Sequence, residues 1–250
     1  RECDTPPRKP KVPPAPTAGM DLLRMRWRDA LFAHWPVDAG TVAAALPEGL
    51  EVATHEGNAW LGVVGFVMED IRPRGSPVGL SFPELNLRTY VSRPGSDEHG
   101  VYFFNLDADD RLGVAVAREL FELPYYRAEI RVRREEREAG PELTLRSRRT
   151  HADVPPARFE ATYRPVGEEF VPEAGTLEAF LTENYRFYTA GGGRLYYGDI
   201  EHPPWPLREG TVEIRSNTLF DASGFEAPGG DPLVHYSPGT DVTAGALRRV

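Results

Sequence analysis

Four polar side chains alternate with apolar ones along residues 84–90, and their types suit the binding and protonation of a small acid. Glu84, Asn86, Arg88 and Tyr90 occupy every second position. Successive side chains of a strand point to opposite faces, so these four share one face. A guanidinium can hold a carboxylate through two parallel hydrogen bonds, and a carboxyl group can act as acid or base. We interpret this face as the polar lining of a cavity, with Glu84 as a catalytic residue and the other three as substrate-binding residues. A solvent-facing side of an edge strand is the alternative that the pattern leaves open.

Two adjacent tyrosines, Tyr125 and Tyr126, follow a proline in the stretch RELFELPYYRA, which begins at Arg118. A phenol could supply a proton or a hydrogen bond if Arg118 or Arg127 lowers its pKa. We predict that Tyr125 is a second catalytic residue and that Tyr126 and Arg118 bind substrate. Ordinary packing of half-buried tyrosines between a helix and a strand is the alternative.

One histidine, His34, lies in an aromatic stretch and is a further substrate-binding candidate. It could act as a general base, and a hydrogen-bonded structural histidine is the alternative. The other histidines are scattered without the spacing of metal ligands, so we predict neither a metal site nor a cofactor. The run Gly191-Gly-Gly193 lacks the lysine of a phosphate-binding loop and is typical of a hairpin tip.

The elements that must position these residues are mostly strands. Apolar, β-branched and alternating segments predict strands at 59–68, 85–91, 101–106, 128–134, 143–147, 159–164, 211–215 and 233–242. Helices are expected at 41–46, after Asp38 as N-cap, at 112–120 and at 176–185. The apolar segment that begins at Leu22 fits either a short helical lead-in or a strand packed at a domain edge.

The order of these elements predicts the fold class. Many strands, few helices and no regular alternation of the two indicate an α+β protein. We expect a mainly antiparallel curved sheet, or distorted β-barrel, with two or three short flanking helices. At 250 residues, residues 20–250 can form one domain around a single sizeable core. Residues 1–19 are rich in proline and poor in large apolar side chains, which predicts a disordered tail.

Several stretches together resemble one protein family. They include LFAHWP at 31–36, FPELNLRTYV at 82–91, YFFNLD at 102–107 and HPPWPL at 202–207. These segments are similar to the DUF2071, or YqjF-like, family of the acetoacetate decarboxylase-like superfamily. The resemblance extends over nearly the whole chain after the tail. It implies a distorted antiparallel barrel with flanking helices, in agreement with the strand pattern.

The resemblance also bears on the chemistry. The stretch from Arg118 is similar to the R-E-x-x-G-x-P-K-K-x-A segment of acetoacetate decarboxylases, in which a lysine forms a Schiff base with the substrate. That lysine corresponds to Tyr125 and its neighbour to Tyr126, while Glu84 corresponds to a glutamate that shapes the cavity. Lys9 and Lys11, both in the proline-rich tail, are the only lysines of the chain. An imine requires a primary amine, so we expect the cavity without Schiff-base chemistry.

Charge and composition limit the kinds of partner that this protein is expected to bind. The net charge of −9 and the isoelectric point near 5.3 argue against a nucleic-acid or anionic-membrane partner, which would demand a basic face. The chain has no apolar run as long as a membrane span and no signal-peptide core, so a cytoplasmic location is expected. The only cysteine is Cys3, which leaves the rest of the chain without a thiol nucleophile.

The function that these observations predict is the binding of a small polar organic molecule that bears a carboxylate. If the protein is an enzyme, a lyase or isomerase reaction on a keto or hydroxy acid, independent of lysine, is expected. A non-catalytic ligand sensor and a structural or interaction protein are the alternatives, and a homo-oligomer is compatible with each.

Overall fold

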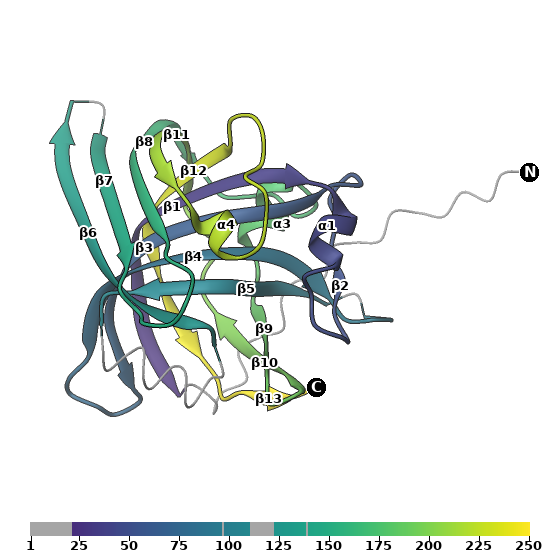
Figure 1. Ribbon diagram of the computed structural model, residues 1–250. Helices are drawn as coiled ribbons and strands as arrows, with labels where there is room; N and C mark the ends of the chain where they lie inside the picture. The colour runs from purple at the N-terminus through teal and green to yellow at the C-terminus, as the bar shows by residue number, and fades with distance from the viewer. Residues whose placement is uncertain (1–21, 97, 111–122, 139) are drawn as a thin grey trace, which may run out of the picture.

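The computed structural model describes residues 22–96, 98–110, 123–138 and 140–250, and strands dominate it (Figure 1). The strands of this part of the chain are β1 Leu23–Val37, β2 Glu51–Val52, β3 Ala59–Pro73, β4 Leu80–Ser92, β5 His99–Ala108, β6 Tyr125–Arg137, β7 Gly140–Arg149, β8 Arg158–Phe170, β9 Arg186–Gly191, β10 Arg194–Glu201, β11 Leu207–Asn217, β12 Leu233–Ala244 and β13 Arg248–Arg249. The helices are short: α1 Ala39–Ala43, α3 Leu177–Thr182 and α4 Leu219–Ala222.

All of these strands belong to one strongly curved sheet. Its order is β13-β10-β9-β5-β6-β7-β8-β11-β12-β1-β3-β4-β2, and further pairings join β4 to β5 and β10 to β12. The β4–β5 pairing joins two strands that lie near opposite ends of this order, so the sheet curves round until these strands meet. Most neighbours are antiparallel, but β5 runs parallel to the start of β6 and to β9. The expected α+β class with a mainly antiparallel curved sheet and short helices is confirmed.

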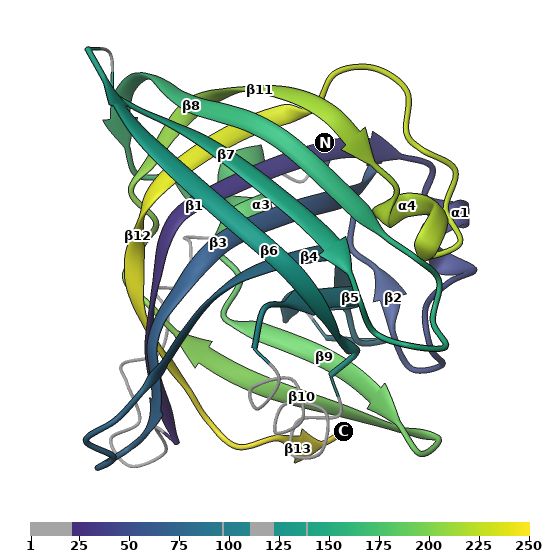
Figure 2. The same cartoon turned by 60° about the vertical axis from the view of Figure 1, so that its left-hand side comes forward.

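The strands β1, β3 and β4 are buried on both faces along much of their length, which explains the nearly continuous apolar run at the start of β3. On one face, Leu61 and Leu85 belong to a core that also contains Leu143, Leu145 and Phe159 of β7 and β8. Figure 2 shows β6, β7 and β8 crossing over β1, β3 and β4 in a second layer. The opposite face of β1, β3 and β4 meets two further clusters, which include residues of β9, α3 and the segment before β11. The polar side chains of β4 lie on this opposite face.

In contrast, β6, β7, β8 and β11 are buried on one side only. Buried positions alternate with exposed ones along β7 and β8. Apolar side chains therefore point to the core while arginine and glutamate point to solvent, as the alternating sequence predicts.

The predictions for single elements are largely confirmed. Asp38 caps α1 by accepting a hydrogen bond from the Thr41 amide at 2.9 Å. The triple glycine lies at the turn between β9 and β10, where Gly192 and Gly193 have positive φ. For the segment from Leu22 the strand alternative is correct, but the strand lies inside the sheet and not at its edge. It forms β1, which pairs with β12 and β3 along most of its length, because both of its faces find apolar partners.

Two expectations fall outside the described residues, namely the tail at 1–19 and the helix at 112–120, which includes Arg118. Among the described helices, none has both the length and the apolar character needed to cross a bilayer.

Candidate functional site

The four polar residues of β4 are all removed from solvent. Glu84 and Asn86 are each 2% exposed, Arg88 is 9% exposed and Tyr90 is fully buried. The reason is that this face of β4 packs against side chains of β9, α3 and the segment before β11. The solvent-facing alternative for this strand face is therefore wrong. A buried face with a carboxyl, an amide, a guanidinium and a phenol is uncommon, because each group must find partners without water.

The Glu84 carboxyl is held from two sides. Asn86 donates its amide to Oε1 at 3.2 Å, and the Tyr125 hydroxyl donates to Oε2 at 2.6 Å. Burial raises the pKa of Glu84 from 4.5 to about 7, although the hydrogen bonds from Tyr125 and Asn86 and the charge of Arg88 oppose the rise. The carboxyl can therefore both accept and release a proton near neutral pH, which suits an acid–base group.

Tyr125 reaches Glu84 from the first position of β6, which pairs in parallel with Leu106 of β5. The phenol is 9% exposed. Burial, reinforced by the neighbouring Glu84 charge and hydrogen bond, raises its pKa well above the usual value. The expectation that an arginine lowers this pKa is wrong, because desolvation and the adjacent carboxyl dominate. Tyr125 is thus a protonated hydrogen-bond donor to Glu84.

Arg88 lies further along the same strand face. Four residues of strand separate the Cα atoms of Glu84 and Arg88 by about 13 Å. Its guanidinium donates one hydrogen bond, from NH2 to the Leu181 carbonyl at 3.1 Å, and lies 5.6 Å and 5.7 Å from the ring centres of Phe32 and Tyr90. Its Nε atom has no hydrogen-bond partner among the described residues, and no carboxylate of these residues forms an ion pair with it.

A second buried arginine provides a contrast. Arg149 of β7 donates two hydrogen bonds to the Asp107 carboxylate, at 2.7 Å and 3.2 Å, and a third to the Pro155 carbonyl at 3.1 Å. Both side chains of this pair are 1% exposed. Where this fold buries an arginine for structural purposes, it therefore supplies a bidentate carboxylate. Arg88 has no such carboxylate partner among the described residues.

His34 of β1 is joined to the same face through Tyr90. The Tyr90 hydroxyl lies 2.7 Å from His34 Nε2 and donates to the Leu181 carbonyl at 2.8 Å. Because the phenol has a single proton, which goes to Leu181, the bond to His34 requires a proton on Nε2. Burial, with the charge of Arg88, lowers the pKa of His34 well below its usual value, so the ring is neutral. His34 is therefore a hydrogen-bonded histidine, the alternative to a general base.

Sequence reasoning missed Gly62 of β3, which makes room for this histidine. A Cβ atom on Gly62 would lie 2.7 Å from Cδ2 and 2.9 Å from Nε2 of His34. It also missed the Leu181 carbonyl at the end of α3, which accepts from both Arg88 and Tyr90. A glycine in an apolar strand is a signal for such close approach, whereas no side-chain pattern could indicate a backbone acceptor.

The substitution Gly62→Ala is expected to lower the free energy of unfolding by about 1–3 kcal/mol, because the added methyl must displace a buried ring. Urea unfolding measures this change. Gly229→Ala is the matched control, since a Cβ there meets nothing within 4 Å. A Gly62→Ala protein as stable as the control would show that His34 is not fixed in this position.

The remaining predicted residues do not join this cluster. Tyr126 belongs to the opposite side of β6, where its ring lies 4.3 Å from the Arg149 guanidinium carbon and edge-on to His151. Adjacent strand residues point to opposite faces, so Tyr125 and Tyr126 cannot both face Glu84. Arg118 lies outside the described residues. The structure thus brings together Glu84, Asn86 and Tyr125, and places Arg88, Tyr90 and His34 further along the same face. That all six line one cavity stays a prediction.

No group of three or more histidine, cysteine, aspartate or glutamate residues in the described ranges is arranged to hold a metal ion.

The curved sheet defines an acetoacetate decarboxylase-like fold. The structure of acetoacetate decarboxylase from Legionella pneumophila is similar with a TM-score of 0.61 at 18% identity, covering 95% of this chain and 92% of that chain. The enduracididine biosynthesis enzyme MppR, in its complex with pyruvate, is similar with a TM-score of 0.63 at 14% identity, covering 94% of this chain and 93% of that chain. At these identities the likeness concerns the fold alone.

Within this fold, the chain belongs to the DUF2071 family. The family model, described as an uncharacterized conserved protein, matches residues 24–241. The uncharacterized protein YqjF of Bacillus subtilis is 42% identical over 234 residues, which cover 92% of this chain and 93% of that protein. The family resemblance predicted from the sequence motifs is confirmed.

Proposed function

We propose that this protein binds a small organic acid on the buried face of β4, with the Arg88 guanidinium as the group that holds the carboxylate. The observation that carries the proposal is the Arg88 side chain, which is buried, makes one hydrogen bond to a neutral carbonyl and has an unpartnered Nε atom among the described residues. A buried charge without a counter-charge is costly. A ligand carboxylate would remove this cost through a bidentate pair.

The other groups of the face support a small polar ligand. Tyr90 and Phe32 place a phenol and an apolar ring beside the guanidinium, and Asn86 adds an amide on the same strand face. A few convergent polar groups in an apolar surround are typical of small-molecule sites. The structural likeness to MppR complexed with pyruvate suggests pyruvate as the first ligand to test.

A second candidate function, proton transfer on the bound acid, is favoured by the environment of Glu84. As a carboxylate, Glu84 could take a proton from the carbon beside a carbonyl group, with the C–H electron pair moving to the carbonyl oxygen to form an enolate. Tyr125 and Asn86 hold the two carboxyl oxygens, which leaves lone pairs for the transferred proton. Such a step belongs to lyase or isomerase chemistry on a keto acid and needs no lysine.

The proposed chemistry excludes an imine intermediate, because residues 20–250 contain no lysine. We expect calorimetry to detect pyruvate binding to the full chain, and we expect borohydride reduction of the same mixture to leave the mass of every peptide from residues 20–250 unchanged. Acetoacetate decarboxylase treated in parallel is the positive control for trapping. A reduced adduct within residues 20–250 would contradict the imine-free mechanism, and the absence of pyruvate, acetate and propionate binding would contradict the ligand class.

A further inference from the structure

One edge of β6 is open beyond its first residues. β6 pairs with β5 only from Tyr125 to Arg127, whereas its pairing with β7 continues from Ala128 to Arg137. The Ile130 amide, on the side away from β7, donates to the Asp109 carboxylate at 3.2 Å. The contact between β6 and the end of β5 extends no further along β6 than this hydrogen bond. Within the described part of the chain, no strand pairs with this edge after Ile130.

The direction of the open backbone groups follows from the strand period. In an antiparallel ladder, the N–H and C=O groups of successive residues point alternately to one neighbour and to the other. Since the Ile130 amide points away from β7, the amides of Val132 and Arg134 also point to the open edge. An exposed edge with free donors and acceptors is a template for another strand.

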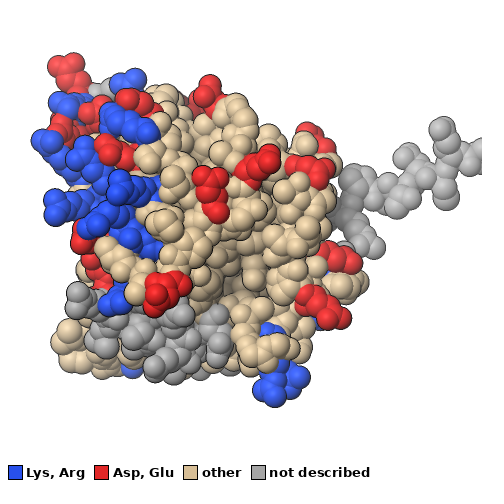
Figure 3. Space-filling model, in the orientation of Figure 1, with Lys and Arg blue, Asp and Glu red and all other residues tan. Residues whose placement is uncertain are grey.

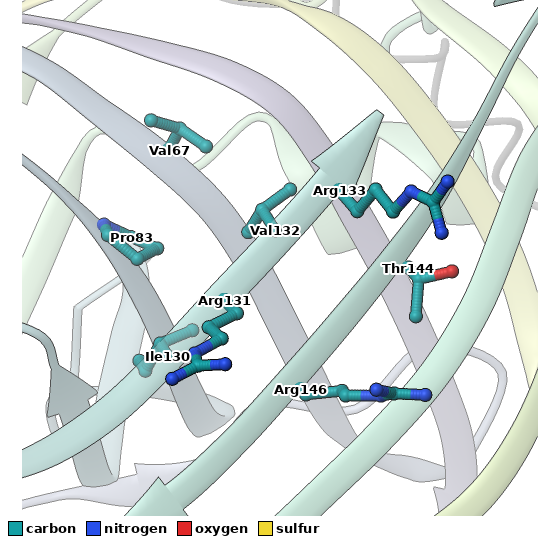
Figure 4. A pocket seen from close by; sticks show the side chains of 8 residues that line it. All are labelled: Val67, Pro83, Ile130, Arg131, Val132, Arg133, Thr144 and Arg146. Atoms are coloured by element: carbon teal, nitrogen blue, oxygen red, sulfur yellow. The ribbon is translucent and has the colours of Figure 1, made fainter. Parts of the chain in front are cut away.

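A groove of about 660 Å³ lies at this edge (Figure 4). Its lining contains both apolar and basic side chains. Val67 of β3 and Pro83 of β4 lie to one side of β6 together with Ile130 and Val132, and the arginine side chains extend over β6 and β7. The residues that line it are Val67, Pro83, Ile130, Arg131, Val132, Arg133, Thr144 and Arg146.

The arginines of this surface are placed where they repel one another. Arg131 is directly opposite Arg146 across β6 and β7, and Arg148 is directly opposite Arg158 across β7 and β8. Like charges at directly opposed positions destabilise a sheet. Arg133, Arg146 and Arg148 have glutamate partners, but Arg131 forms no ion pair with any described residue. Figure 3 shows the basic side chains gathered over the side of the molecule where β6 and β7 lie, although the chain carries a net charge of −9.

We propose that the open edge of β6 binds an extended peptide of a partner protein in which acidic and apolar residues alternate. The peptide would add as a strand beside Val132 and Arg134, with its main chain bonded to the free amides. Its side chains on the outer face would be acidic, because they meet Arg131 and Arg133. Those on the inner face would be apolar, because they meet Val67, Pro83 and Val132.

Charge favours an acidic peptide over two other strands that could pair with this edge, namely the chain's own tail and the β6 strand of a second copy. The chain's own residues 1–19 carry Arg8, Lys9 and Lys11 and several prolines, which cannot donate to a ladder. A second copy paired edge to edge about a two-fold axis at Val132, the middle of the open edge, would place Arg131 of one β6 against Arg133 of the other. An acidic peptide removes the repulsion, whereas both alternatives increase it.

The test is fluorescence anisotropy with the labelled peptide Glu-Val-Glu-Val-Glu, blocked at both ends, titrated with the full chain. We expect saturable binding that weakens with salt, and weaker binding of a Lys-Val-Lys-Val-Lys peptide by at least about tenfold. The double variant Arg131→Glu with Arg133→Glu should weaken binding of the acidic peptide by at least about tenfold. Arg164→Glu on β8, away from the groove, is the matched charge control and should bind like the unmodified protein.

Val132→Pro separates strand addition from simple charge attraction. Proline removes one outward amide without removing a β6–β7 hydrogen bond, so the fold should persist while binding is lost. Undiminished binding to folded Val132→Pro would overturn the proposal. If this variant does not fold, hydrogen exchange on the unmodified protein tests strand addition instead. The bound peptide should slow exchange of the Val132 and Arg134 amides, and unchanged exchange would overturn the proposal. An unbound chain that sediments as a dimer through this edge would also overturn it, as would failure of the acidic peptide to bind.

Discussion

Replacing Arg88 with methionine is expected to abolish binding of carboxylate ligands while leaving the fold intact. Loss of one partner of a buried charge pair costs about 3 kcal/mol, which weakens pyruvate binding by a factor of roughly 100. The free energy of unfolding should stay the same or rise, because an uncompensated buried charge disappears and methionine fits between Phe32 and Tyr90. The Leu181 carbonyl keeps its hydrogen bond from Tyr90.

Arg149→Met is the matched control for this experiment, since Arg149 is a buried arginine with a carboxylate partner. Its removal leaves the Asp107 carboxylate buried without a counter-charge and should lower the free energy of unfolding by about 3–5 kcal/mol. Calorimetric titration with pyruvate and urea unfolding together give both quantities for each variant. If Arg88→Met loses stability as Arg149→Met does, Arg88 has a structural role and the ligand assignment is wrong.

Glu84→Gln is expected to change how stability depends on pH. The Glu84 pKa is about 7 in the folded chain and 4.5 without the protein environment. Between these values the folded chain holds a proton that the unfolded chain has released, so the Glu84 contribution to stability is full below pH 4.5 and is lost as the pH rises through 7. The loss amounts to about 3 kcal/mol. Glutamine has no such titration and can still accept the hydrogen bond from Tyr125.

Urea unfolding at pH 5 and pH 8 measures this effect. Relative to the unmodified protein, Glu84→Gln should become more stable by about 2.5 kcal/mol on going from the lower to the higher pH. Glu173→Gln, which alters an exposed carboxylate, should follow the unmodified protein at both values. Parallel pH dependence in Glu84→Gln and the unmodified protein would show that the carboxyl titrates normally. Any proton-transfer activity on a keto acid should also fall by about 10²–10⁴ in Glu84→Gln.

Much of the fold could be predicted because its strands follow simple patterns. The alternation in β7 and β8 follows from burial of one face, and the apolar run in β3 follows from burial of both faces. The sequence could not distinguish helix from strand for β1, because an apolar run that is buried on both faces shows no regular alternation of apolar and polar residues. Nor could it place β1 at the centre of the sheet, since its pairing with β12 joins residues more than 200 positions apart.

The site was predictable to a similar extent. The strand period placed Glu84, Asn86, Arg88 and Tyr90 on one face without any knowledge of their neighbours, and burial removed the solvated alternative. Tyr125 and Tyr126 are both predicted to belong to the site, as catalytic and substrate-binding residues, although the same period sends them to opposite sides of β6. The direction of the Tyr125 pKa shift could not be predicted, because it depends on burial and on a carboxyl that lies 41 residues away in the chain.

A crystal structure of the protein soaked with pyruvate would show whether the buried face of β4 holds a carboxylate through Arg88. The predicted result is a pyruvate carboxylate within about 3.2 Å of two guanidinium nitrogens of Arg88, on the side of β4 that carries Glu84. A structure with pyruvate bound away from Arg88, or with an internal acidic side chain paired with that guanidinium in place of the ligand, would contradict it.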